Sequence, residues 1–122
     1  MGDDTSTDSF REELTLRGLN FEERKVGNST AFIIGVYPII YGRNSGKSLT
    51  LGFVLPLDYP STAPAGVHYR WTPDLGNAPG NPQSSDLGGG WQRMSRVVQG
   101  WVPGHRTSSH YLAQVDGWLE LV

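Results

Sequence analysis

The chain contains no cysteine among its 122 residues. This absence excludes disulfide bonds, zinc sites built from thiolates and any thiol nucleophile. Basic residues are also few, since ten Lys and Arg stand against twelve Asp and Glu and leave a formal net charge of -2. Such a balance argues against binding to nucleic acid through general electrostatics. The longest apolar segment, Ala31–Tyr41, is interrupted by Gly35 and Pro38 and is shorter than the ~20 residues of a membrane span.

The amino-acid composition fits one folded domain. Hydrophobic residues make up 37% of the chain and charged residues 18%, which indicates a protein that is neither disordered nor embedded in a membrane. The first eight residues carry three aspartates and lack the basic-then-apolar pattern of a signal peptide. We expect residues 1–8 to form a disordered leader, residues 9–122 to form one domain, and the protein to be cytoplasmic.

Two segments show the spacing of amphipathic helices. Ser9 starts a capping-box pattern that predicts a helix over Ser9–Arg17, and Gly18 suits the left-handed position of a Schellman motif after it. A second helix is predicted at the end of the chain, with Ser108 or Ser109 as its N-cap. Its apolar stripe comprises Tyr111, Leu112, Val115, Trp118, Leu119 and Val122.

Between the two helices the hydrophobic period changes to two, which is typical of strands. The turn-like segments Gly27–Ser29 and Gly42–Gly46 predict hairpins, and therefore a four-stranded antiparallel meander. The predicted strands are Phe21–Val26, Ala31–Tyr41, Leu49–Leu57 and Val67–Trp71.

The segment 72–100 shows no sustained period, so we expect a long loop that crosses the surface, a kind of segment that is usually functional. The predicted fold class is therefore α+β: an N-terminal helix, the meander, the long loop and a C-terminal helix. We expect Trp118 and Leu119 to be buried against the sheet face that carries Leu49, Leu51 and Phe53.

Two local patterns suggest ligand sites but do not meet their requirements. Gly42–Ser48 resembles the end of a phosphate-binding loop, yet the first glycine of that motif is replaced by Tyr41 and a strand follows instead of a helix. The histidines His68, His105 and His110 lack the spacing of a metal site. We therefore expect neither a metal nor a cofactor.

A different set of motifs resembles a known family. The segment Phe53–Pro64, with its Tyr59-Pro60 pair, looks like the strand and Tyr-Pro-x-x-x-Pro turn of ubiquitin-conjugating enzymes. Trp101-Val102-Pro103 matches the family's Trp-x-Pro element, which precedes a helix here as it does there. Together with Trp91–Arg96, it resembles a divergent bacterial branch of the UBC-like superfamily. The resemblance covers about residues 9–121, with its specific motifs confined to 53–104.

The chain departs from this family at its active site. The family's catalytic cysteine has no counterpart, and its His-Pro-Asn motif is absent from the neighbourhood of Thr72–Asp74. Ser95, six residues before Trp101, is the candidate to replace the cysteine. The resemblance then implies a serine that carries the C-terminal acyl group of a ubiquitin-like protein as an oxyester. An ester is less activated than a thioester, so the step requires a base and donors to the oxyanion.

Three further residues are candidates for those roles. Arg93 and Arg96 flank Ser95 and supply positive charge that stabilises an oxyanion or guides an acidic partner. His105 is the nearest histidine in the sequence and is the candidate general base. The predicted catalytic residues are therefore Ser95, His105, Arg93 and Arg96.

The resemblance implies a place in a bacterial ubiquitin-like conjugation pathway. The expected partners are a ubiquitin-like protein, its activating enzyme and a deconjugating peptidase, because members of this branch are encoded beside such proteins. Two functions remain open at this point. In one, the chain is an acyl transferase that uses serine in place of cysteine. In the other, it is a non-catalytic UBC-like scaffold that binds the ubiquitin-like protein or the activating enzyme.

Overall fold

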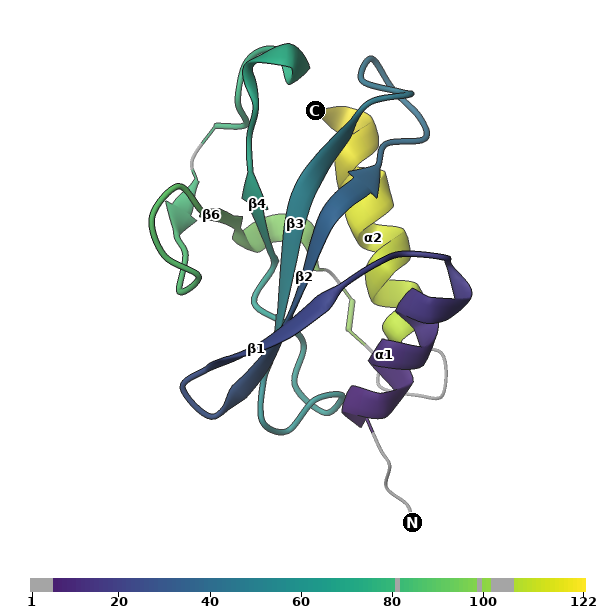
Figure 1. The fold of residues 1–122 in the computed structure, drawn as a ribbon, viewed down its shortest axis with the longest axis vertical. Helices are drawn as coiled ribbons and strands as arrows, with labels where there is room; N and C mark the ends of the chain where they lie inside the picture. Colours follow the sequence, from purple (N-terminus) through teal and green to yellow (C-terminus); the bar gives the residue numbers. More distant parts are fainter. Residues whose placement is uncertain (1–5, 81, 99, 102–106) are drawn as a thin grey trace.

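The computed structural model describes residues 6–80, 82–98, 100–101 and 107–122. In this part of the chain two α-helices lie on one face of an antiparallel sheet of six strands, ordered β1-β2-β3-β4-β6-β5 (Figure 1). The elements are α1 (Ser6–Leu16), β1 (Glu22–Val26), β2 (Ser29–Pro38), β3 (Ser48–Leu55), β4 (Val67–Arg70), the 3-10 turn η1 (Pro73–Leu75), β5 (Gln83–Ser84), β6 (Gln92–Met94), the 3-10 turn η2 (Ser95–Val97) and α2 (Thr107–Leu121).

Helix α1 ends as the sequence predicts but begins earlier. Gly18 has φ +74°, and the N–H of Leu19 donates to the carbonyl of Leu14 at 3.1 Å, which confirms the Schellman motif. The helix begins at Ser6, however, so Ser9 lies inside it and the predicted capping box is wrong. Part of the segment expected as a leader is therefore helical.

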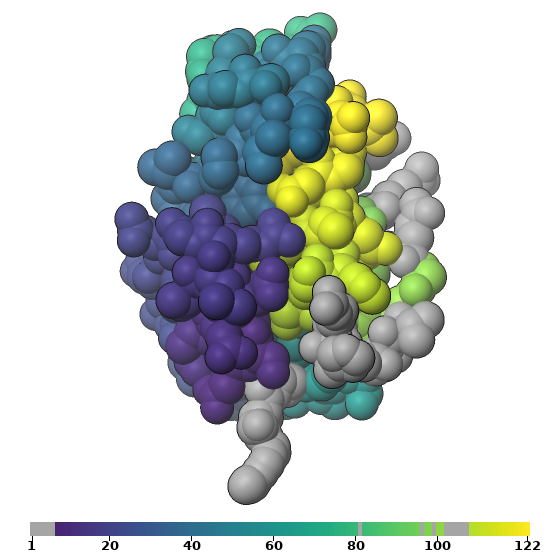
Figure 2. Space-filling model, turned by 90° about the vertical axis from the view of Figure 1, so that its right-hand side faces the viewer, coloured from purple at the N-terminus to yellow at the C-terminus, as the bar shows by residue number. Residues whose placement is uncertain are grey.

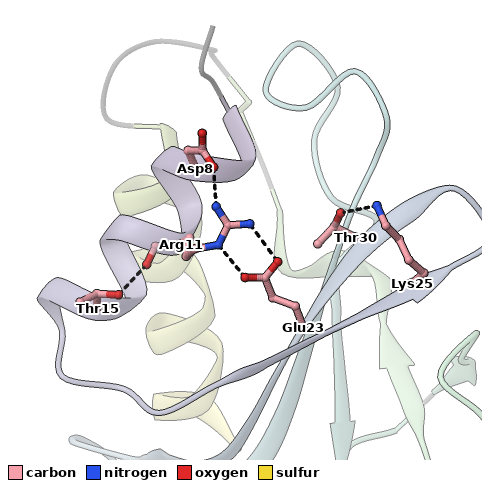
Figure 3. Close-up of polar contacts among 6 residues, drawn as sticks. All are labelled: Asp8, Arg11, Thr15, Glu23, Lys25 and Thr30. Atoms are coloured by element: carbon pink, nitrogen blue, oxygen red, sulfur yellow. Dashed lines mark hydrogen bonds and ion pairs between the residues drawn. The ribbon is translucent and has the colours of Figure 1, made fainter. Parts of the chain in front are cut away.

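An ion-pair network connects the first turns of α1 to β1. Arg11 pairs with Asp8 one turn before it, and its Nε and Nη2 donate to the two carboxylate oxygens of Glu23 on β1 at 2.6 and 2.8 Å (Figure 3). These hydrogen bonds lower the pKa of Glu23. Exposed pairs of this kind contribute at most about 1 kcal/mol each. Here they join α1 to the edge strand β1.

The hydrophobic core lies between the sheet and the helices. Its largest rings meet at Phe10, whose ring centroid is 5.3 Å from that of Phe32 on β2 and 5.9 Å from that of Tyr111 on α2. The alternating residues of β3 face the same core, as their period predicts. These are Leu49, Leu51, Phe53 and Leu55, all buried.

Helix α2 contributes the predicted stripe, with two corrections. Leu119 is buried, but Trp118 is only partly buried at the margin of the core, where its ring centroid lies 5.4 Å from that of Tyr69. The helix begins at Thr107, so Ser108 and Ser109 are helical residues and not caps. The hydroxyl of Ser108 is instead hydrogen-bonded to the hydroxyl of Tyr59.

The helices pack against each other as well as against the sheet. Figure 2 shows α1 in purple and α2 in yellow, side by side on one face of the molecule. Asp116 of α2 joins the layers, since it accepts hydrogen bonds from Tyr37 of β2 at 2.7 Å and from Arg17 after α1 at 3.2 Å. Burial and the Asp116 carboxylate raise the pKa of Tyr37. Among the described helices, none is long and apolar enough to cross a membrane.

The described part of segment 72–100 contains more regular structure than the predicted surface loop. Strand β6 pairs with the free edge of β4, and β5 pairs with β6, so the sheet has six strands and the expectation of four is wrong. An exposed row of unpaired backbone groups on β4 explains this addition, because pairing satisfies those groups. The added strands have only two and three residues, which is too short to show a period.

Candidate functional site

The two most specific motifs of the sequence lie in contact. The indole Nε1 of Trp101 donates to the carbonyl of Pro60 at 2.8 Å, and the ring centroids of Trp101 and Tyr59 are 6.1 Å apart. Trp101 also lies edge-on to Tyr111 of α2 at 6.4 Å. The tryptophan thus anchors the chain after η2 between the Tyr-Pro turn and the last helix.

Helix α2 holds this turn through two buried hydroxyl groups. The hydroxyls of Tyr59 and Ser108 are hydrogen-bonded at 2.6 Å, and the hydroxyl of Tyr111 donates to the carbonyl of Gly66 at 2.6 Å. Burial raises the pKa of Tyr59 to about 12, so the phenol stays protonated at neutral pH. The turn between β3 and β4 is therefore fixed at both ends by the same helix.

Replacing Trp101 by phenylalanine tests this anchor. The ring contacts remain while the hydrogen bond to Pro60 is lost, so the free energy of unfolding should fall by about 1 kcal/mol in urea denaturation. Trp71 is the matched control, because its Nε1 makes a similar bond to the carbonyl of Gly76 at 2.9 Å in a more exposed place. Trp71→Phe should cost less, and an equal loss in the two variants would contradict the anchoring role.

Ser95 begins η2 directly after β6, and its side chain is exposed. Its position is fixed by the backbone beneath it. A Cβ added to Gly66 would lie 2.0 Å from the carbonyl oxygen of Met94 and 2.7 Å from the Cα of Ser95. Only a glycine, here with φ +89°, allows this approach. Ser95 thus presents an exposed hydroxyl from a backbone segment that packs closely against Gly66.

Arg93 lies two residues before Ser95 and joins three segments of the site. Its Nη1 donates to the carbonyl of Ala65 at 2.9 Å, and its Nη2 lies 3.4 Å from the Oε1 of Gln83. Its Nε lies 3.5 Å from the carbonyl of Ser84. A guanidinium carries five N–H donors. Two of them have no acceptor within the described residues and can bind an oxyanion.

The structure says less about the other two predicted catalytic residues, Arg96 and His105. Arg96 lies in η2, one residue after Ser95, so the backbone places it at the same corner. His105 and the Val102-Pro103 pair lie outside the described residues. Ser95, Arg93 and Arg96 are therefore brought together at the end of β6, while the proposed pairing of Ser95 with His105 stays a prediction.

The structure also pairs two residues that were not predicted to act together. The Nδ1 of His68 on β4 lies 2.7 Å from the hydroxyl of Ser85, which follows β5. His68 is 4% exposed, and burial together with the positive charge of Arg93 lowers its pKa to about 4, against the opposing effect of Asp86. The imidazole is therefore neutral at pH 7. The partners are seventeen positions apart in the sequence, so no local motif predicts the pair.

The loop that carries Ser85 folds back over the outer face of the sheet. A Cβ on Gly52 of β3 would lie 2.4 Å from the Cδ1 of Leu87 and 3.2 Å from the ring of Trp91, so these side chains cover that glycine. The guanidinium of Arg70 lies 5.7 Å from the centre of the Trp91 ring. Trp91 thus anchors this loop in the way that Trp101 anchors the chain after η2.

Comparison with protein families gives a match that covers most of this chain. The model described as "Prokaryotic E2 family E" matches residues 7–122, which is nearly the whole sequence. The matched range includes α1 from its second residue, α2, the six described strands and the corner that carries Ser95. Comparisons with curated proteins and with solved structures give no match.

Proposed function

The chain belongs to prokaryotic E2 family E, and on that premise we propose that it accepts the C-terminal acyl group of a ubiquitin-like protein from an activating enzyme. The observation that carries the proposal is the position of Ser95. It is an exposed hydroxyl that precedes Trp101 by the spacing expected of the family's nucleophile, in a chain without cysteine. The resulting bond is an oxyester.

The proposed step transfers the acyl group from a thioester to Ser95. The Ser95 Oγ attacks the carbonyl carbon, so a C–O bond forms and the C–S bond to the activating enzyme breaks. The hydroxyl proton passes to His105, the proposed base, and from there to the departing thiolate. Arg93 supports the step because two of its N–H donors are without an acceptor among the described residues, and such donors stabilise an oxyanion.

A second candidate function is a scaffold that binds the ubiquitin-like protein or the activating enzyme without accepting the acyl group. One observation favours it. A transferase would need a base beside Ser95. The buried histidine His68 is hydrogen-bonded to Ser85 instead, and the hydroxyl of Ser95 has no hydrogen-bond partner among the described residues. In either function a deconjugating peptidase belongs to the same pathway.

The two functions differ in whether a covalent adduct forms. We expect an adduct when the chain is incubated with the activating enzyme, the ubiquitin-like protein and ATP. The adduct should resist thiol reductants and break under hydroxylamine or alkali, as an ester does. Ser95→Ala should abolish it without loss of fold or partner binding. Ser61→Ala, which removes an exposed hydroxyl from the Tyr-Pro turn, should leave the adduct at the level of the unchanged chain.

Two results would count against the transferase. An adduct that persists in Ser95→Ala shows that another group accepts the acyl chain. Tight binding of both partners by the unchanged protein without any adduct supports the scaffold instead. Ser95→Cys adds an independent check, since a productive site should then form an adduct that thiol reductants break.

A further inference from the structure

The pair formed by Ser85 and His68 has the hydrogen-bond arrangement of a nucleophile and its base. The N–H of Leu87 donates to the Ser85 Oγ at 3.1 Å, and the Nδ1 of His68 lies 2.7 Å from the same oxygen. We assign the Nε2–H tautomer to His68, so that Nδ1 accepts the proton of the Ser85 hydroxyl. That direction of donation is the one by which a histidine activates a serine.

The surroundings of His68 keep it in the form that accepts a proton. Its imidazole is buried on β4, and the charged groups that act on it are Arg93 of β6 and Asp86 of the Ser85 loop. Burial and Arg93 lower its pKa to about 4, which holds it neutral at pH 7 but also makes the imidazolium costly to form, and the carboxylate of Asp86 offsets part of that cost. A serine that only closed a turn would need the bond from Leu87 and no histidine.

A hollow of about 350 Å³ lies beside the pair. Its size is at the lower end of the range of small-molecule sites. His68, Ser84 and Asp86 form part of its wall, whereas Ser85 itself does not line it. Most of the other lining residues are apolar, and Arg93 adds a cation. The remaining lining residues are Val54, Pro56, Thr62, Ala63 and Ala65.

We propose that Ser85 and His68 form a second acyl-accepting site, in which the hydroxyl of Ser85 takes a small acyl group from a thioester or another activated ester. The Ser85 Oγ attacks the acyl carbonyl carbon, so a C–O bond forms and the bond from that carbon to the leaving group breaks. The hydroxyl proton moves to the Nδ1 of His68 and then to the leaving thiolate or alkoxide. Arg93 lines the neighbouring hollow and has two N–H donors without an acceptor among the described residues, which can stabilise the negative charge that develops on the carbonyl oxygen.

The test uses p-nitrophenyl acetate, which needs no partner protein and therefore does not depend on the function proposed for Ser95. We expect release of p-nitrophenolate with acetylation of the tryptic peptide Trp71–Arg93, and fragmentation should place the acetyl group on Ser85. Ser85→Ala should remove that acetyl group. Thr72→Ala is the matched control, because it deletes an exposed hydroxyl of the same tryptic peptide that does not line the hollow, and acetylation of Ser85 should proceed at the unchanged rate.

His68→Asn separates catalysis from structure. The asparagine amide keeps a hydrogen-bond partner for the Ser85 hydroxyl but cannot take its proton, so acetylation of Ser85 should slow about a hundredfold while the unfolding transition is retained. Acetylation confined to lysines or the amino terminus would overturn the proposal. So would Ser85 acetylation at an equal rate in a folded His68→Asn protein.

Discussion

Replacing Phe10 by alanine should lower the free energy of unfolding by about 3–5 kcal/mol, as removal of a fully buried aromatic ring does. Phe10 is 0% exposed, and its ring contacts residues of every layer of the fold. The partners, with centroid distances, are Phe32 at 5.3 Å, Phe53 at 5.6 Å, Tyr111 at 5.9 Å and Tyr59 at 6.0 Å. The cavity would therefore open where α1, the sheet, α2 and the Tyr-Pro turn meet.

Chemical denaturation measures this loss, with Leu16→Ala as its control. Leu16 lies on the same helix but is 76% exposed, so its replacement should change stability by no more than about 0.5 kcal/mol. If the two variants unfold at the same denaturant concentration, α1 does not pack on the sheet as described.

The second large effect is expected at Gly66, which sets the position of Ser95. Gly66→Ala must hold a side chain at φ +89° and also displace the Met94 carbonyl, which would lie 2.0 Å from the new Cβ. The conformational cost and the overpacking together should lower stability by about 4 kcal/mol. Because the shift falls on Met94 and Ser95, formation of the proposed adduct should decline as well.

Gly46 provides a control that separates the two causes. Its φ of +88° matches that of Gly66, but no atom lies within 4 Å of the position that its Cβ would take. Gly46→Ala should therefore cost only the conformational term, about 1 kcal/mol, and leave the adduct unaffected. Equal losses of stability in the two alanine variants would show that Gly66 is not in close contact with the Ser95 backbone.

The regular part of the fold was predictable because its signals are periodic. The alternating apolar residues of β3 and the stripe of α2 each repeat often enough to reveal which face is buried. Gly18 was equally informative, since few residues other than glycine adopt its φ of +74°. The prediction for Trp118 was wrong because a hydrophobic stripe indicates which side of a helix faces the core but not how deeply each residue is buried. This indole lies at the margin of the core.

The features that the sequence did not reveal depend on contacts between distant residues. Strands β5 and β6 arise from pairing with β4 and carry no period of their own. The bond between His68 and Ser85 likewise links a strand to a loop on its outer face. The choice of Ser95 came from its spacing before Trp101, and the structure adds that this serine is exposed and lies against the Gly66 turn.

The most direct measurement is peptide mapping of the adduct with the ubiquitin-like protein. Trypsin cleaves after Arg93 and Arg96 and so releases Met94-Ser95-Arg96, in which Ser95 is the single hydroxyl residue. The acyl remnant is expected on this peptide, in a bond that hydroxylamine removes. A remnant on Trp71–Arg93, which contains Ser84 and Ser85, or on any other peptide would contradict the assignment of Ser95 as the acceptor.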